Sequence, residues 1–387
     1  MKKLNDFIIE NVSIVTPEGI LERASASVCQ GRLYKIREGY IDNGGERIDA
    51  GGGWLLPGFI DMHSDALEKD LEPRPNCLFP LDIVLYEMDK KLAACGVTTM
   101  YHSISFAEEE IGIRSNSMAA DIITRIGQAV KRLHVRTRVH ARFEITDGTA
   151  IPRIESLLAE GKIQMLSLMD HTPGQGQFRE ILSFRNYYQT VYRKSDDEIQ
   201  KIIDRKMGAR KFITSHVDRI TRICRRLAIP MASHDDDCRE KIDWISEQDI
   251  RITEFPVNME TVHAAREKGL FICLGAPNIV RGTSQARNLS ARDAIAAGGG
   301  DIICSDYAPM AILHAVFTLE KLGILPLHQA VNMASLLPAK ALGISDITGS
   351  LEEGKAADLI LVKNGDGVHR IMKTCVEGRE VFSTWLK

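Results

Sequence analysis

The sequence predicts an α/β fold: a (β/α)8 barrel at the centre of the chain, joined to a small β-sandwich that both termini form. Three observations support this prediction. Eight strand-like runs alternate with helical patterns through the middle of the chain, which is typical of stacked βαβ units. Short strand-like runs cluster at both ends. Histidine and carboxylate residues follow the central strands at their carboxyl ends, where the chemistry of such barrels is found.

Composition supports a globular protein with a sizeable core. The chain has 387 residues, 44% hydrophobic and 26% charged, a length that suits one (β/α)8 barrel with additions. The net charge of −3, without a charged tail, disfavours nucleic-acid binding. The eight cysteines are scattered without a CxxC pair, which is typical of reduced thiols in a cytosol. Since no apolar run approaches the length of a membrane span and the N-terminus lacks a signal-peptide core, we expect a cytoplasmic protein with no nucleic-acid or membrane partner. A homo-oligomer is left open.

The two ends of the chain are expected to pair with each other. Turn signals at Pro17-Glu-Gly19 and Asn43-Gly-Gly45 separate short strands near the N-terminus. The predicted terminal strands are 7–9, 12–15, 24–28, 32–36, 357–362 and 374–382. Because an isolated hairpin is only marginally stable, we expect residues 1–54 and 346–387 to form one composite β-sandwich.

Residues 55–345 are predicted to form the barrel. Its strands are expected near 55–62, 97–103, 136–145, 163–170, 229–234, 250–256, 270–275 and 301–306. The helical segments include 81–94, 117–133, 151–159, 215–227, 261–268, 291–297, 310–322 and 327–336. A stretch at about 176–214, rich in Arg, Lys, Tyr and Asp, interrupts this rhythm and is expected to be a helical, functional insertion.

Metal-ligand residue types recur at the ends of the predicted barrel strands. They are His63 and Asp65, His140 and Glu144, Asp170 and His171, His234 and Asp235, and Asp306. Alternate residues of a strand point to one side, and the carboxyl ends of barrel strands meet at one rim. Mixed imidazole and carboxylate ligands suit Zn²⁺, Mn²⁺ or Fe²⁺ better than Ca²⁺. The pattern therefore predicts a divalent-metal site.

Several motifs resemble the amidohydrolase superfamily. The lead-in Pro57-Gly-Phe-Ile-Asp61 and the late Gly349-Ser-Leu-Glu-Glu-Gly-Lys-Ala-Ala-Asp358 match it. Longer motifs resemble the diphosphatase branch of phosphonate metabolism, within the carbon–phosphorus lyase pathway. They include Ser64–Lys69 with Glu72-Pro-Arg74, Ser167–Gln175 and Gly275–Gly282. The resemblance implies a distorted barrel with one or two divalent metals, and hydrolysis of a ribose methylphosphonate triphosphate with release of pyrophosphate.

The resemblance also implies roles for individual residues. The expected ligands of a two-metal centre are His63, Asp65, Glu144 as the bridge, His171, His234 and Asp306, with Asp306 as the catalytic general base. Two features depart from the superfamily pattern. His63-Ser-Asp65 replaces His-x-His, and His171 and His234 follow the fourth and fifth predicted strands rather than the fifth and sixth. Either a strand before residue 163 is missed, or Glu254 joins the ligand set.

Cations in and beside the matching loops are expected to bind a small-molecule triphosphate. They are Lys69, Arg74, Arg142, Arg179 and Arg281, with Asn278 in the same loop as Arg281. Arginine can clamp a phosphate bidentately. Exposed backbone N–H groups of the loop that contains Arg281 could add to an anion site.

Two other functions stay open. The first is hydrolysis of a cyclic amide, N-acyl or amino substrate at the same metals, since fold and metal do not fix the substrate. A neutral amide would not need this number of cations. The second is a metal-free scaffold of the same fold. The aspartate at position 65, where the superfamily has a histidine, favours the scaffold. The carboxylates and histidines that are retained argue against it.

Overall fold

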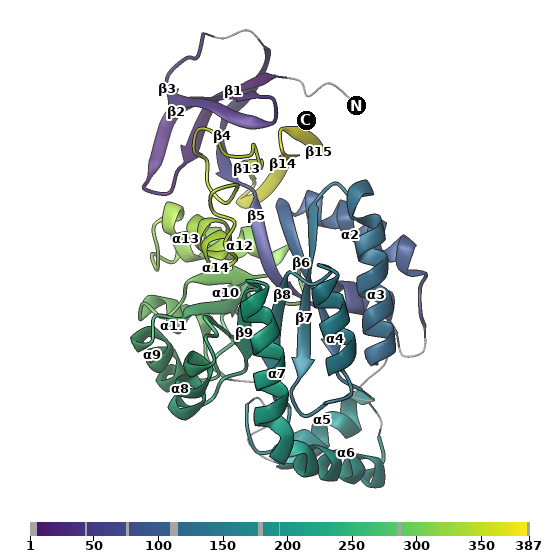
Figure 1. The fold of residues 1–387 in the computed structure, drawn as a ribbon. Helices are drawn as coiled ribbons and strands as arrows, with labels where there is room; N and C mark the ends of the chain where they lie inside the picture. The colour runs from purple at the N-terminus through teal and green to yellow at the C-terminus, as the bar shows by residue number, and fades with distance from the viewer. Residues whose placement is uncertain are drawn as a thin grey trace.

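A nearly closed barrel of eight parallel strands forms the centre of the molecule (Figure 1). The computed structural model describes residues 6–42, 45–74, 77–108, 115–176, 181–192, 194–284 and 288–384. The strands, each paired with the next in chain order, are β5 (Phe59–Ser64), β6 (Val97–Phe106), β7 (Arg136–Glu144), β8 (Met165–Met169), β9 (Met231–His234), β10 (Ile252–Glu254), β11 (Phe271–Gly275) and β12 (Ile302–Cys304). The last strand meets the first through backbone bonds from Asp65 N to Asp306 O (2.8 Å) and from Asp306 N to His63 O (3.0 Å). The predicted barrel is confirmed.

The strand count resolves one alternative that the sequence left open. Between β7 and β8 the described residues contain helix α4 but no further strand. His171 therefore does follow the fourth barrel strand, His234 ends the fifth, and Glu254 ends the sixth.

Helices pack around the barrel and provide most of the apolar surface that covers it. They are α1 (Ala66–Leu71), α2 (Leu81–Ala94), α3 (Asn116–Ala129), α4 (Ile151–Ala159), α7 (Ile213–Arg226), α8 (Arg239–Glu247), α9 (Met259–Glu267), α10 (Ala276–Arg281), α11 (Ala291–Ala296), α12 (Ala311–Lys321), α13 (Leu327–Ala334) and α14 (Leu336–Ala341). Four of these helices, α1, α8, α10 and α14, were not expected from the sequence. Three of them, α1, α10 and α14, have only six residues each, too few to show a helical period. None of the described helices could cross a membrane.

The insertion forms two helices, α5 (Ile181–Tyr192) and α6 (Asp196–Ala209), as predicted. A capping box between Ser195 and Glu198 begins α6. The two helices share a small core of their own, made of Phe184, Tyr188, Ile199, Ile202 and Ile203. Figure 1 shows them beyond the arrowhead of β7, at the carboxyl end of the barrel strands. The insertion therefore lies at the end of the barrel where the predicted ligands are.

Strands from both ends of the chain form one seven-stranded sheet, as expected from the terminal patterns. The strands are β1 (Phe7–Val15), β2 (Ile20–Cys29), β3 (Arg32–Glu38), β4 (Glu46–Pro57), β13 (Leu359–Gly365), β14 (Val368–Val376) and β15 (Arg379–Ser383), in the order β15-β14-β13-β4-β1-β2-β3. The antiparallel pair of β4 with β13 joins the two ends of the chain. One face of the sheet has its own apolar core. The predicted strand over 374–382 is wrong in one respect, because a turn at Glu377-Gly378 divides it.

The predicted strand over 55–62 is also divided, at Gly58. Leu55, Leu56 and Pro57 pair with β13 in the terminal sheet, and the barrel strand begins at Phe59. A Cβ atom at Gly58 would lie 2.2 Å from side-chain atoms of Thr98, so only glycine fits where the chain passes from the sheet into the barrel. The division of the chain into two domains at residues 54 and 346 stays a prediction.

Candidate metal centre

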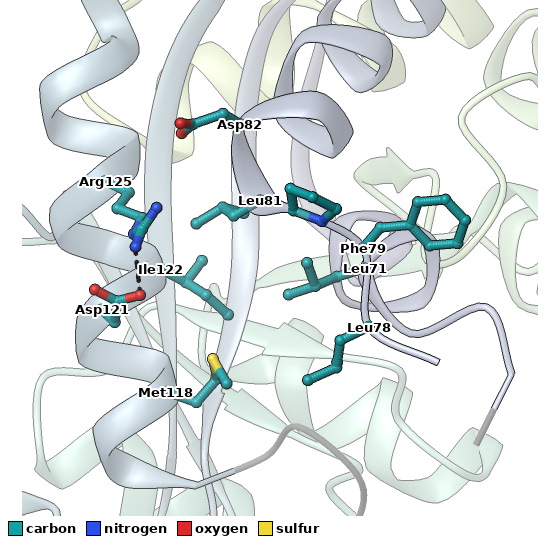
Figure 2. Close-up of a pocket in the computed structure, with 10 residues that line it drawn as sticks. Leu71, Leu78, Phe79, Leu81, Asp82, Met118, Asp121, Ile122 and Arg125 are labelled. Carbon is teal, nitrogen blue, oxygen red and sulfur yellow. Dashed lines mark ion pairs between the residues drawn. The ribbon is translucent and has the colours of Figure 1, made fainter. Parts of the chain in front are cut away.

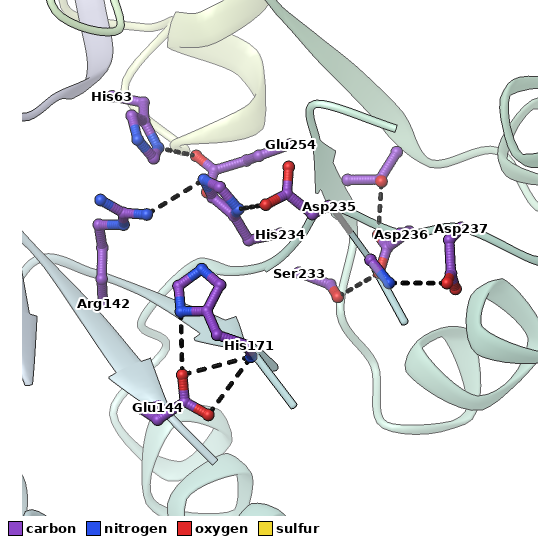
Figure 3. A network of polar contacts seen from close by, with 12 residues as sticks. His63, Arg142, Glu144, His171, Ser233, His234, Asp235, Asp236, Asp237 and Glu254 are labelled. Carbon is purple, nitrogen blue, oxygen red and sulfur yellow. Dashed lines mark hydrogen bonds and ion pairs between the residues drawn. The ribbon is translucent and has the colours of Figure 1, made fainter. Parts of the chain in front are cut away.

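Two groups of metal-donor side chains lie side by side at the carboxyl ends of the barrel strands. The first is His63, His140 and Glu254, and the second is His171, His234 and Asp235; within each group the donor atoms lie within 4.8 Å of one another. The ring centroids of His63 and His234, one from each group, are 5.3 Å apart. Figure 3 shows how all of these side chains except His140 converge. The two groups could thus hold two neighbouring cations.

Hydrogen bonds in the first group leave lone pairs that suit a cation. His140 Nδ1 lies 3.0 Å from the carbonyl oxygen of Met62. Because a carbonyl can only accept, Nδ1 carries the proton and Nε2 presents a lone pair. His140 Nε2 and Glu254 Oε2 are 3.8 Å apart, and neither has a hydrogen-bond partner among the residues described. Buried polar atoms without partners are costly, and a histidine and carboxylate set fits a divalent cation.

Burial keeps the imidazoles of the first group neutral, which is the form that binds metals. It lowers the pKa of His140 to about 3. The pKa of His63 is also well below its usual value, because of burial and then the charge of Arg142. His63 Nδ1 lies 3.0 Å from Glu254 Oε1. Glu254, which the sequence analysis left open, thus contacts both histidines.

The second group is slightly more open, with side chains 10% to 14% exposed. His234 Nδ1 lies 2.9 Å from Asp235 Oδ2. Burial alone would raise the pKa of Asp235, but the adjacent His234 outweighs it and the pKa is about 2. The Asp235 carboxylate is therefore ionised and available to a cation at neutral pH. His171 Nδ1 lies 3.0 Å from Glu144 Oε2.

Strained backbone holds the ends of three strands that meet at this site. Asp235 and Phe255 directly follow β9 and β10 with φ values of 54° and 55°, and Asp306 lies two residues after β12 with a φ of 57°. Residues with a side chain rarely adopt this left-handed region, and they persist there only when the surroundings impose it. The ring of Phe255 packs edge-on against His63 at 4.9 Å between centroids and also contacts His234. The loops after these strands thus fix the imidazoles in place.

The predicted ligands separate into two sets. His63, His171 and His234 lie in the donor groups. Asp65, Glu144 and Asp306 lie outside both, and their assignment as ligands stays a prediction. His140 and Asp235, which lie at or near the ends of predicted strands in the sequence, are not among the expected ligands but lie in the donor groups.

Two of the three remaining carboxylates, Asp65 and Glu144, have charged partners. Asp65 Oδ1 lies 3.3 Å from the ammonium of Lys69. Glu144 is paired with His171 and with the buried Lys206. Burial, and then the negative charge of Asp65, raises the pKa of Asp306 to about 7.

Among the predicted phosphate-binding residues, Arg142 lies deepest in the site. It is 6% exposed, and its Nη2 donates to His234 Nε2 at 3.3 Å. Its Nε has no hydrogen-bond partner in the part of the chain that the structure describes. A guanidinium that is buried beside the donor groups, with an unused N–H, is suited to bind an anion.

The other predicted phosphate contacts lie farther out. Lys69 lies near Asp65 with its ammonium 4.5 Å from the ring centroid of Tyr307, and Arg74 and Arg281 are exposed. Asn278 binds the backbone of Leu289 and Ala291 through its amide, so it anchors its own loop. Arg179 lies outside the described residues.

A cavity of about 340 Å³ lies away from the donor groups, between the loop before α2 and helix α3 (Figure 2). Its lining is Leu71, Leu78, Phe79, Pro80, Leu81, Asp82, Met118, Asp121, Ile122 and Arg125. Arg125 and Asp121 pair with each other at 3.1 Å. Since none of its residues belongs to the donor groups, we place the chemistry at the strand ends.

Comparison with known proteins identifies the class of protein. Residues 54–381 match the Amidohydrolase family, so this chain belongs to that family. The chain is 33% identical over 380 residues to the alpha-D-ribose 1-methylphosphonate 5-triphosphate diphosphatase of Escherichia coli (strain K12), covering 97% of this chain and 100% of that protein. It is 21% identical over 404 residues to an L-hydantoinase of Paenarthrobacter aurescens, covering 92% and 85%.

Solved structures show the same fold. The dihydropyrimidinase from Brevibacillus agri matches with a TM-score of 0.66 at 14% identity, covering 98% of this chain and 95% of that one. The N-acetylglucosamine-6-phosphate deacetylase from Pasteurella multocida matches with a TM-score of 0.64 at 13% identity, covering 97% and 99%. At these identities the likeness concerns the architecture alone.

Proposed function

We propose that this protein is a metal-dependent hydrolase that cleaves alpha-D-ribose 1-methylphosphonate 5-triphosphate to the 5-phosphate and pyrophosphate in phosphonate catabolism. The observation that carries the proposal is the buried guanidinium of Arg142, with an unused N–H, beside two groups of metal donors. Such a cation suits a polyanionic substrate and has no purpose for a neutral one. The 33% identity to the diphosphatase over 97% of the chain supports the same substrate.

The two donor groups would each hold one divalent cation, with Zn²⁺, Mn²⁺ or Fe²⁺ the best match to their ligands. His63, His140 and Glu254 would hold one, and the second group would hold the other. Asp65 and Asp306 remain candidates for additional contacts to these cations. Divalent metals held there would lower the pKa of a bound water molecule and would neutralise part of the negative charge of the phosphates.

The residues of the chain position the substrate and move one proton. Asp306 would accept a proton from the water that attacks a phosphorus of the triphosphate, while the bond to the pyrophosphate oxygen breaks. Arg142 would bind the non-bridging oxygens on which negative charge collects. Lys69, Arg74 and Arg281 would hold the outer phosphates.

Pyrophosphate release tests the proposal directly. We expect rapid release from the ribose methylphosphonate triphosphate and slower release from nucleoside triphosphates, since only the former carries the phosphonate. The matched control is the corresponding 5-phosphate, which cannot yield pyrophosphate. Rapid turnover of dihydropyrimidines with no action on either triphosphate would contradict the proposal.

A cyclic amide is the second candidate substrate. The 21% identity to an L-hydantoinase over 92% of this chain favours it. The same metals would serve that reaction, but it gives the buried Arg142 no role.

A scaffold without metal is the third candidate. It would be favoured by less than about one divalent ion per chain in protein purified from metal-replete medium.

A further inference from the structure

A buried ion pair connects the helical insertion to the second donor group. Lys206 Nζ, from α6, lies 3.3 Å from Glu144 Oε1, and these side chains are 3% and 2% exposed. The other oxygen of Glu144 lies 3.0 Å from His171 Nδ1. Thr146 Oγ1 also donates to Glu144 Oε1 at 2.8 Å. Figure 3 shows Glu144 directly beside His171.

The position of Lys206 in its helix is unusual for a lysine. Ile199, Ile202 and Ile203 form the apolar stripe of α6, and Lys206 continues it at the i+7 position. Lysine is almost never fully buried unless it is paired. The chain therefore places a cation on an apolar face where Glu144 is its counter-ion. The other lysine in the middle of α6, Lys201, is exposed.

We propose that Lys206 is a positioning residue for metal binding, acting through Glu144 on His171. The ammonium of Lys206 holds the Glu144 carboxylate in place, and that carboxylate accepts the N–H of His171 Nδ1. With the proton fixed on Nδ1, the lone pair of His171 is on Nε2. Glu144 is thus the partner of a metal ligand rather than a ligand. This inference rests on the metal centre of the proposed function.

Two physical arguments support this assignment. Histidine ligands of metals usually donate their second N–H to a carboxylate, which fixes the ring and its tautomer. The carboxylate in turn needs a counter-charge, because a buried carboxylate without a cation is strongly destabilised. Lys206 supplies that charge from a helix of the insertion. The insertion is therefore part of the metal centre and not only a cover beside it.

The test is Zn²⁺ affinity of the metal-free protein, measured by competition with a chromophoric chelator. We expect Lys206→Met to weaken Zn²⁺ binding about 10- to 100-fold, the usual effect of losing such an outer partner. Lys201→Met, at an exposed site of the same helix, should leave the affinity unchanged. Lys206→Arg should restore most of it, because the positive charge is kept.

A second readout separates positioning from general damage to the fold. Nitrogen NMR of the His171 imidazole in metal-free protein should report the Nδ1–H tautomer in the wild type and a mixture of tautomers in Lys206→Met. Unchanged Zn²⁺ affinity together with an unchanged tautomer in a folded Lys206→Met variant would overturn the proposal.

Glu144→Gln provides the test if Lys206→Met does not fold. It should weaken Zn²⁺ binding to a similar extent while both ions still bind at high concentration. Complete loss of one ion in this variant would make Glu144 a direct ligand and would overturn its assigned role. None of these measurements involves the triphosphate, so an error in the substrate would leave their outcome readable.

Discussion

Arg142 is the residue on which the choice of substrate depends. We expect Arg142→Met to lower kcat/KM for the triphosphate about 10²- to 10³-fold, the usual loss when one donor to developing charge is removed. Its side chain is buried beside His234, and the donor groups do not include it, so bound metal should be retained. The control is Lys90→Met at an exposed surface position. Steady-state kinetics with metal analysis checks both, and an unaltered kcat/KM would contradict the assigned role.

Arg281 tests the outer part of the substrate site. Because this side chain is exposed at the end of α10, its contact with a phosphate should be worth about 1 kcal/mol. Arg281→Ala should therefore raise KM about five-fold with little change in kcat. The metal content should stay at the wild-type value. Loss of metal in this variant would show that Arg281 has been misplaced.

At the scale of single elements, β7 explains why the ligands could be predicted only in part. His140 and Glu144 are four residues apart on one face of this strand, so their Cα atoms are separated by roughly 13 Å along it. Periodicity predicts the shared face correctly. Only the packing of neighbouring strands decides that His140 meets His63, whereas Glu144 meets His171 and Lys206. Lys206 itself comes from an insertion whose placement no local pattern encodes.

The α5–α6 pair should unfold locally without loss of the barrel. Its core is small and separate, and Phe184 is fully buried there against Tyr188. Truncation of a buried Phe costs about 3 to 5 kcal/mol, so Phe184→Ala should speed hydrogen exchange in α5 and α6 while exchange in β5–β12 stays slow. Leu182→Ala, at a side chain that is 69% exposed, is the control. Equal acceleration throughout the barrel would contradict a separate core.

At the scale of the whole molecule, more of the architecture could be predicted. Alternating patterns predicted the eight barrel strands, because strands buried on both faces read as short apolar runs. The pairing of the two ends followed from the weakness of lone hairpins. The point where the chain leaves the terminal sheet and enters the barrel, at Gly58, could not be predicted. Mostly apolar residues from Leu55 to Ile60 lie on both sides of that point.

The ion pair between Arg136 and Asp358 should contribute strongly to the packing of the barrel against the terminal sheet. Arg136 at the start of β7 lies 2.8 Å from Asp358, which is 1% exposed and precedes β13. Arg136→Met would leave that carboxylate without its cation, so we expect the free energy of unfolding to fall by about 3 kcal/mol. Urea denaturation measures this change. Lys268→Met, in the exposed pair with Asp243, is the control, and it should change the free energy by less than about 1 kcal/mol.

The most direct test of the account is anomalous diffraction from a crystal of the metal-loaded protein, recorded at the absorption edge of the bound metal. The account predicts two ions at the carboxyl end of the barrel. One should be bound by His63, His140 and Glu254, and the other by His171, His234 and Asp235. Anomalous density at neither group in a metal-replete crystal would contradict it.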